Sequence, residues 1–224
     1  MQIIKNIRDK EPDLFEKIES YLAQGFYLAG FLDYECGYHF EPVLNKLDPT
    51  QPVAWFGVYQ QLLVFNHLAG RFEDPDAAEA LHLEAGPFSA EWYQVTGLEL
   101  VITKADYLNK VERIKEYIAA GDVYQINYTG KYHFQFRGSV VSLYQDLKQK
   151  QPVPYGALIN CGDRQILSCS PELFFQLQAA KIKTKPMKGT APRGKTLQED
   201  QAIREWLRHD EKNRAENLMI VDLL

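Results

Sequence analysis

The sequence predicts an α+β fold in which helices are mixed with antiparallel strand pairs. Apolar residues recur every three to four positions over residues 11–24, which predicts an amphipathic helix. Alternating residues over 123–136 predict two strands of about six residues that could form a hairpin, and Phe174–Leu177 with Lys181–Lys185 predict another hairpin. From Leu197 onward the pattern is helical again.

The amino-acid composition already excludes several classes of protein. The 224 residues are 46% hydrophobic and 25% charged, which supplies a sizeable core and excludes a disordered or fibrous chain. The charged residues, 25 Lys+Arg against 30 Asp+Glu, give a net charge of −5. Such a chain is not suited to hold nucleic acid along its length, whereas a small anion needs only a local basic pocket.

Cysteines and targeting signals indicate a compartment. Cys36, Cys161 and Cys169 are odd in number and form no C-x-x-C pair, so we expect reduced core thiols. The first residues contain no apolar segment typical of a signal peptide. No apolar run is long enough for a membrane-spanning helix. We therefore expect a cytoplasmic protein without a membrane partner.

Helix and strand signals also fill the rest of the chain. Thr103 is positioned to cap a helix, with Asp106 at its third position and Gly121 at its end. Near Leu98 a loop-like stretch of the sequence gives way to regular helix and strand patterns, and we divide the chain there into regions 1–97 and 98–224. The other predicted segments are strands at Val53–Val58, Leu62–His67, 155–160 and 165–170, a helix at 140–149, and a linker at 69–92 around a short Ala-rich helix.

The last seven residues, Leu218–Leu224, are almost wholly apolar and contain neither glycine nor proline. Chain termini are usually polar and loosely held, and a helix that is apolar on nearly all sides belongs inside a protein. We therefore expect that the sequence stops within an element and that the rest of the core is missing. A terminal helix that docks on its own chain or at an oligomer interface is the alternative.

Two segments could bring polar groups to a ligand. In 121–129 the side chains of Gln125, Asn127 and Thr129 would share one face of a strand, which is either a ligand-binding face or a solvent face. Glu172 follows Ser170-Pro171 and precedes three apolar residues. A desolvated carboxyl there would favour its protonated form and suit a general acid, and an exposed loop residue is the alternative.

The segment 181–195 holds six basic residues and no acidic one. Lys181, Lys183 and Lys185 fit the solvent-exposed side of a strand. Lys188 departs from that rhythm and precedes Gly189-Thr190, which would let a ligand approach the backbone. This pattern suits anion binding, a nucleophilic lysine, or only a basic turn.

The segment 210–217 predicts a charged helix turn. Asn213 and Glu216 lie three residues apart and share a face, as do Lys212 and Glu216 four apart. Such an oxygen pair can contribute to a Mg²⁺ site, although one carboxylate is too few for a full site. A solvated helix face is the alternative.

In this order and spacing the four segments resemble the chorismate-utilising enzymes, and within them the aminodeoxychorismate synthase component I subgroup. The residues that carry the resemblance are Gly121–Thr129, Ser170-Pro171-Glu172, Pro186–Thr190 with Arg193-Gly194, Asp210–Leu224, and the G-F-x-x-Y-E segment Gly30–Glu35. The resemblance covers essentially the whole chain. The blocks that are specific in combination are Ser170-Pro171-Glu172, Pro186–Thr190 with Arg193-Gly194, and Asp210–Leu224.

The resemblance implies roles for individual residues. Lys188 falls where the subgroup has the lysine that attacks the chorismate ring and displaces the 4-hydroxyl, a position at which anthranilate synthases have alanine. Glu172 falls on the general acid/base, and Gly189 and Thr190 fall on substrate-contacting positions. Gln125 falls where isochorismate and salicylate synthases have a water-activating lysine, which implies ammonia as the nucleophile.

The resemblance also implies Mg²⁺ and a partner subunit. Glu216 falls on a Mg²⁺ ligand, and Asn213 falls where anthranilate synthases have a further Mg²⁺-associated glutamate. A glutamine amidotransferase subunit would supply ammonia. The implied activity forms 4-amino-4-deoxychorismate for para-aminobenzoate and folate biosynthesis. The alternatives are an anthranilate synthase component I and a non-catalytic remnant that docks a glutaminase.

The implied fold is a sandwich of mostly antiparallel sheets flanked by helices, to which both halves of the family's chain contribute. Region 1–97 corresponds to the N-terminal region of component I, and 98–224 to the first half of the chorismate-binding catalytic domain. We therefore expect a chain with exposed sheet edges and apolar faces that is inactive and poorly folded alone.

Overall fold

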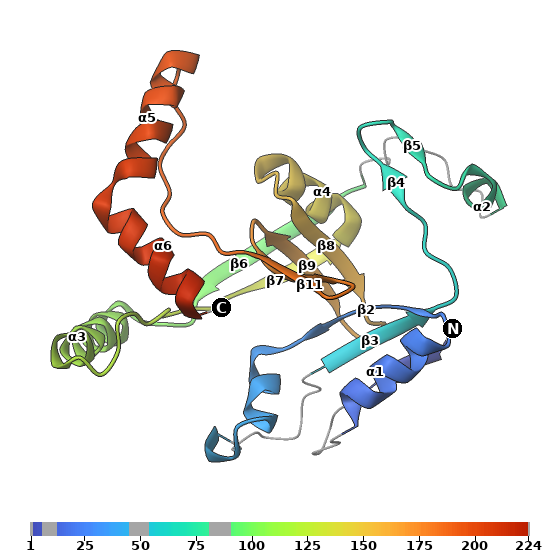
Figure 1. Ribbon diagram of the computed structural model, residues 1–224, viewed down its shortest axis with the longest axis horizontal. Coiled ribbons are helices and arrows are strands. Elements are labelled where there is room, and N and C mark those ends of the chain that lie inside the picture. Colours follow the sequence, from blue (N-terminus) through green and yellow to red (C-terminus); the bar gives the residue numbers. More distant parts are fainter. Residues whose placement is uncertain (1, 6–12, 45–53, 81–90, 224) are drawn as a thin grey trace. The chain divides into compact units, whose positions relative to one another are not determined.

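A computed structural model describes residues 2–5, 13–44, 54–80 and 91–223 (Figure 1). The chain forms two compact units, one of Met1–Phe88 with Gly156–Ser168 and the other of Ser89–Tyr155 with Cys169–Leu224. The boundary that the sequence pattern predicted after residue 97 lies within strand β6 (Tyr93–Leu100). It stays a prediction about the regions of the sequence.

The first unit contains a three-stranded antiparallel sheet in the order β1 (Gln2–Lys5), β3 (Ala54–Tyr59), β2 (Tyr27–Leu32). The central strand β3 is almost wholly apolar, and Ala54, Trp55 and Val58 are buried. Helix α1 (Leu14–Ala23) confirms the predicted amphipathic helix from Leu14 on, while residues 11–12 lie outside the described ranges. Leu14 packs with Cys36 and Ala54 in the core of this unit.

The first unit also contains several short elements. They are the 3₁₀ turns η1 (Tyr34–His39) and η2 (Pro42–Leu44), the strands β4 (Phe65–Asn66) and β5 (Arg71–Phe72), and helix α2 (Pro75–Ala80) in the predicted linker. The strand predicted at Leu62–His67 is thus only partly correct. The side-chain oxygen of Asn66 accepts hydrogen bonds from the backbone N–H of Leu68 and Ala69, which turns the chain and ends the strand early.

In the second unit β6 pairs antiparallel with β7 (Tyr132–Gly138), and α3 (Lys104–Ala120) lies between them in sequence. The predicted cap is confirmed, because Thr103 Oγ1 accepts a hydrogen bond from Asp106 N at 3.1 Å. Gly121 ends the helix at φ +81°, a conformation that favours glycine. Helix α4 (Val140–Lys150) contacts β6, and Tyr93 Oη donates to the Asp146 carboxylate at 2.5 Å.

The strand predicted over 123–129 is wrong, and so is the hairpin it would form with the following strand. Residues 122–131 form neither helix nor strand, and β7 pairs with β6 instead. Alternation selects a face but supplies no backbone partner, and no described strand lies hydrogen-bonded beside this segment. Of the three side chains that were expected to share a strand face, two are in contact, since Gln125 Nε2 donates to Asn127 Oδ1 at 3.0 Å.

The strands predicted at 155–160 and 165–170 are confirmed, and so is the hairpin predicted from Phe174–Leu177 and Lys181–Lys185. Strand β8 (Tyr155–Asn160) pairs with β9 (Gln165–Ser170), and β10 (Leu173–Gln178) pairs antiparallel with β11 (Lys181–Lys185). In the second pair Leu173 lies opposite Lys185, but Gln176 lies opposite Lys183. Two residues of β10 therefore face one of β11, which is a β-bulge next to Glu172.

The helical C-terminal region divides into α5 (Leu197–His209) and α6 (Glu211–Leu223), with a bend between them (Figure 1). Asp210 has extended backbone angles, φ −62° and ψ 121°, and interrupts the helix. At the other end of α5, Arg193 Nε and Nη2 donate to the two carboxylate oxygens of Asp200 at 2.6 and 2.7 Å. Gly194 N donates to the same carboxylate at 3.0 Å, so the preceding loop is joined to the first turn of α5.

Large apolar side chains remain exposed within the described ranges. Phe174 on β10 is 71% exposed and Leu218 on α6 is 72% exposed. The predicted exposure of apolar faces is therefore found, and the α+β class with antiparallel pairing is confirmed. All three cysteines are free, as predicted, but Cys169 is only half-buried. None of the helices in the described ranges is long and apolar enough to cross a bilayer.

The β10–β11 turn leads to a stability prediction. Its two central residues are Ala179 and Ala180, and Ala179 has φ +51°, where the side chain of an L-residue is crowded. Ala179→Gly should stabilise the protein by about 0.5 to 1 kcal/mol. Ala180→Gly is the matched control and should not stabilise. Urea unfolding followed by circular dichroism measures both, and equal effects would contradict the prediction.

The Arg193–Asp200 pair leads to a pH prediction. The hydrogen bonds from Arg193 lower the pKa of Asp200 below its ordinary value, and Gly194 N–H adds to the effect. The pair therefore stabilises the start of α5 fully above the unfolded-state pKa of Asp200, and this stabilisation is lost as pH falls through the lower folded-state pKa. We expect the carboxyl carbon resonance of Asp200 to titrate below the ordinary aspartate range, and Arg193→Ala to move the midpoint up toward that range while the Gly194 N–H bond keeps part of the effect. A Lys195→Ala variant, in which the pair is retained, is the control.

Candidate active site

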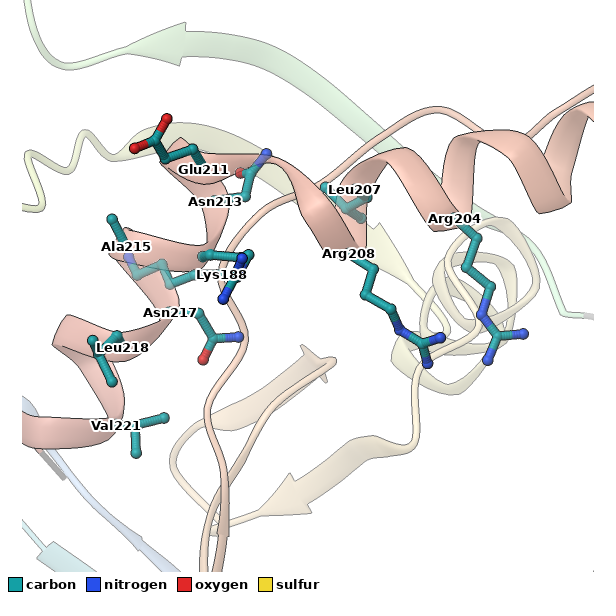
Figure 2. Close-up of a pocket in the computed structure, with 11 residues that line it drawn as sticks. Lys188, Arg204, Leu207, Arg208, Glu211, Asn213, Ala215, Asn217, Leu218 and Val221 are labelled. Carbon is teal, nitrogen blue, oxygen red and sulfur yellow. The ribbon is translucent and has the colours of Figure 1, made fainter.

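The residues after β11 carry Lys188 and form neither helix nor strand over 186–194, a segment we call the Lys188 loop. Lys188 is half-buried and lies in an open pocket of about 850 Å³ that it shares with α5 and α6. Figure 2 shows the lining side chains, which come from the Lys188 loop and from both helices. They are Lys188, Arg204, Leu207, Arg208, Glu211, Asn213, Arg214, Ala215, Asn217, Leu218 and Val221.

Glu172 contacts the Lys188 loop through the β10–β11 hairpin. Because Leu173 pairs with Lys185, the residue before β10 lies opposite the residues that follow β11. The backbone N–H of Met187 donates to Glu172 Oε1 at 3.2 Å. The carboxylate is therefore held next to the residue that precedes Lys188. Glu172 is exposed in this chain, which agrees with the exposed loop residue and not with the desolvated carboxyl that the sequence also left open.

Gly189 lies against Asn213 at the start of α6. Gly189 has φ +81°, and a Cβ there would lie 2.8 Å from Asn213 Oδ1 and 3.0 Å from its Cγ. A larger residue would both strain the backbone and collide with the asparagine. Asn213 is in turn held by Asp210, whose Oδ2 accepts from Asn213 N at 2.9 Å and from Nδ2 at 2.7 Å. The fold therefore brings together two of the predicted site residues, Gly189 and Asn213.

The charge around the pocket is mainly positive. Its described lining includes four basic side chains and one acidic side chain, that of Glu211. Arg204 and Arg208 extend side by side from α5 in Figure 2, and Arg208 Nη1 also lies 3.3 Å from Glu205 Oε1. In a chain with net charge −5 this is a local basic pocket of the kind that the composition left open for a small anion.

Glu216 could contribute to a metal site but does not make one in this chain. Its carboxylate is half-buried and lies 3.8 Å from Lys212 Nζ, as the spacing predicts. Among the described residues no group of three or more His, Cys, Asp or Glu side chains could hold a metal ion. Mg²⁺ is commonly bound by one or two carboxylates and takes its other oxygen ligands from water and substrate. The Glu216 carboxylate could therefore be one ligand of a Mg²⁺ site.

Two predicted residues lie apart from this arrangement. Gln125 is exposed, bonds to Asn127 and is not part of the described pocket lining. Thr190 is exposed and follows Gly189 in the Lys188 loop. The structure thus brings Lys188, Gly189 and Asn213 together and holds Glu172 one residue from Lys188. It does not bring Gln125 into the pocket.

Sequence reasoning missed the residues that hold the loop and line the pocket. Asp200 had a readable signal, since it lies in the first turn of the helix predicted from Leu197, where acidic side chains accept backbone hydrogen bonds. Asp210 had none, because the helical prediction ran through it, whereas in the structure it precedes α6 and accepts from Asn213 N. Arg204 and Arg208 lie four residues apart on α5 and share a helix face. Nothing in the sequence indicates that this face meets the Lys188 loop.

Comparison with known proteins places the chain in a family. A family model described as chorismate binding enzyme matches residues 3–224. The chain is 33% identical over 204 residues to anthranilate synthase component 1 of Methanothermobacter thermautotrophicus, covering 88% of this chain and 43% of that protein. It is 30% identical over 233 residues to aminodeoxychorismate synthase component 1 of Escherichia coli, covering 100% of this chain and 51% of that protein.

A solved structure supports the fold. Anthranilate synthase component I from Streptococcus pneumoniae superposes with a TM-score of 0.70 at 24% sequence identity, covering 89% of this chain and 48% of that one. The chain therefore spans about half the length of the relatives that it matches. Since the family model covers nearly every residue, including the Lys188 loop and both pocket helices, the chain belongs to the chorismate binding enzyme family.

Proposed function

We propose that the protein carrying this chain acts as an aminodeoxychorismate synthase component I, which converts chorismate and ammonia to 4-amino-4-deoxychorismate. The observation that carries the proposal is the position of Lys188. It lies half-buried in a basic pocket. Its neighbour Met187 is hydrogen-bonded to Glu172, and its other neighbour Gly189 lies against Asn213. A lysine presented in this way suits nucleophilic attack on a bound anion.

The chemistry divides one substitution into two. The Lys188 amine forms a bond to the chorismate ring as the bond to the 4-hydroxyl oxygen breaks, and Glu172 gives that oxygen a proton so that it leaves as water. Ammonia then forms a bond to the carbon that carried the 4-hydroxyl as the bond between Lys188 and the ring breaks, which frees the lysine amine and yields the amino product. Met187 N–H engages one carboxylate oxygen of Glu172, which holds the acid beside the nucleophile's own loop.

The basic side chains that line the pocket and the backbone near Gly189 would orient the substrate. Chorismate carries two carboxylates, which Arg204, Arg208 and Arg214 can attract into the pocket. Gly189 leaves room for the ring near the backbone, and Thr190 offers a hydroxyl. Mg²⁺ at Glu216 would supply charge to hold one substrate carboxylate. Ammonia would come from a glutamine amidotransferase subunit, and the reaction would take place in the cytoplasm.

Anthranilate synthase component I is the second candidate. Relatives with that name match at similar identity, 33% against 30% for the aminodeoxychorismate synthase, and the superposed structure is an anthranilate synthase. The resemblance that assigns alanine to the position of Lys188 in anthranilate synthases favours the first candidate. The two candidates differ in whether a covalent intermediate forms on the enzyme.

Replacing Lys188 separates the two candidates. With chorismate and Mg²⁺ but without ammonia, the mass of the intact protein should rise by the adduct, and peptide mapping should locate it on Lys188. Lys188→Ala should abolish the adduct, because no amine then reaches the ring from this loop. Lys185→Ala, an exposed lysine on β11, is the matched control and should retain it. Anthranilate formation by Lys188→Ala without any adduct in the parent would favour the second candidate.

If the parent forms neither an adduct nor a product, the result would instead favour a non-catalytic module that docks a glutaminase.

Glu172→Gln offers an independent check on the proposed acid. It keeps the size of the side chain but removes the proton, so the rate of adduct formation should fall on the order of 10²-fold or more. Stopped-flow absorbance of chorismate measures the rate, and an unchanged rate would show that Glu172 is not the acid.

Replacing Glu216 tests the magnesium proposal. Glu216→Gln removes the half-buried carboxylate on α6, so more Mg²⁺ should be needed for half-maximal activity. Glu112→Gln, on the exposed face of α3, is the matched control. Titration of activity with Mg²⁺ gives the comparison, and identical curves for the parent and Glu216→Gln would contradict a ligand role.

A further inference from the structure

The start of α6 meets the loop that carries the proposed nucleophile, and its side chains are ordered for that contact. We propose that Asn213, oriented by Asp210, is a positioning residue that sets the backbone of Gly189 and thereby the place of Lys188. This inference rests on the proposed function for its catalytic meaning. It assigns Asn213 a role other than the Mg²⁺-associated one that the resemblance implies.

The first step is the orientation of the Asn213 amide. Asp210 Oδ2 accepts from Asn213 Nδ2 at 2.7 Å, and the same atom accepts from Asn213 N at 2.9 Å. An ionised carboxylate only accepts hydrogen bonds, so the amide nitrogen must face Asp210. Both residues are half-buried, which limits competition from water. The amide oxygen is therefore turned away from Asp210.

The second step is what the amide oxygen meets. A Cβ on Gly189 would lie 2.8 Å from Asn213 Oδ1, 3.0 Å from Cγ and 3.2 Å from Cβ. The whole asparagine side chain thus lies along the Gly189 backbone. Gly189 holds φ +81° at this contact, so the loop turns at the point where α6 touches it. Lys188 is the residue immediately before that turn.

The third step is the fixation of Lys188 from both sides. On its N-terminal side Met187 N donates to Glu172, and on its C-terminal side Gly189 lies against Asn213. Lys188 and Asn213 also line the same pocket. With its nitrogen committed to Asp210 and its oxygen against the loop, Asn213 is placed to support the loop.

The test measures Lys188 directly, in the whole protein that carries this chain. Limited acylation with a small amine reagent, read by peptide mapping, gives the rate at Lys188 relative to the exposed lysines 181, 183 and 185 of β11. In the parent the acylation rate at Lys188 should differ from the rates at these three exposed lysines, because the pocket and the loop set both its accessibility and its nucleophilicity. Asn213→Ala and Asp210→Ala should bring its rate toward theirs. Asp210→Asn keeps an acceptor oxygen and should recover most of the parent value.

Asn109→Ala is the matched control, because Asn109 is an exposed asparagine in the middle of α3. Asn213→Asp is a second variant of equal size that loses the donor to Asp210 and adds a like charge beside it. It should also release Lys188 while favouring the first turn of a helix. The buried thiols of Cys36 and Cys161 in the first unit and the half-buried thiol of Cys169 in the second should react with thiol reagents as they do in the parent, which excludes unfolding of either unit as the cause.

With chorismate, Asn213→Ala should lower kcat on the order of tenfold or more and change KM little, because a displaced nucleophile slows the chemical step. An unchanged Lys188 acylation rate in both Asn213 variants would overturn the positioning role. A weaker response to Mg²⁺ with unchanged acylation would return Asn213 to the metal. If Lys188→Ala still forms an adduct while Asn213→Ala alters acylation, the proposed function fails and the positioning role stands.

Discussion

The position of Lys188 depends on side-chain contacts rather than on secondary structure. Residues 186–194 have no helix or strand hydrogen bonds of their own, so other elements must hold the loop. Glu172 holds Met187, Asn213 supports Gly189, and Asp200 holds Arg193 and Gly194. An ionised group takes part in two of these contacts, and hydrogen bonds to charged groups are the stronger kind. The loop is therefore fixed at its start, middle and end.

Each contact depends on an irregularity in an otherwise regular element. The bulge in β10 shifts the register so that Leu173 meets Lys185, which sets Glu172 beside the residues after β11. The extended backbone of Asp210 separates α5 from α6, and its carboxylate accepts hydrogen bonds from the backbone and side-chain nitrogens of Asn213. Irregularities of this kind commonly occur beside functional sites, where they aim particular side chains.

The elements that sequence reasoning predicted correctly are those whose signals are local. The Thr103 cap, the stop at Gly121 and the β10–β11 hairpin each depend on residues close in sequence. The strand expected over 123–129 failed because pairing is decided by a distant partner, and β7 finds its partner in β6. Alternation along one segment carries no information about which strand will lie beside it.

The same distinction applies to the site. Lys188, Gly189 and Asn213 were candidates from motif spacing, and the structure brings them together. The spacing did not indicate that Asp200 and Asp210 hold the loop and its support, because those contacts join the loop to helices whose packing the sequence leaves open. Arg204 and Arg208 were missed for the same reason, since a charged helix face has the same sequence pattern whether it borders a pocket or only water.

The exposure of Glu172 connects the chemistry to the apolar surface beside it. A carboxyl acts as a general acid near neutral pH when burial favours its protonated form, and Glu172 is exposed in this chain. Phe174 and Phe175 follow on β10 and are 71% and 56% exposed, so they form an apolar surface next to it. A protein surface that covered these two rings would lie close to the Glu172 carboxyl and would also exclude water from it. In the proposed function, burial of the rings on β10 and dehydration of the proposed acid are therefore linked by this hairpin.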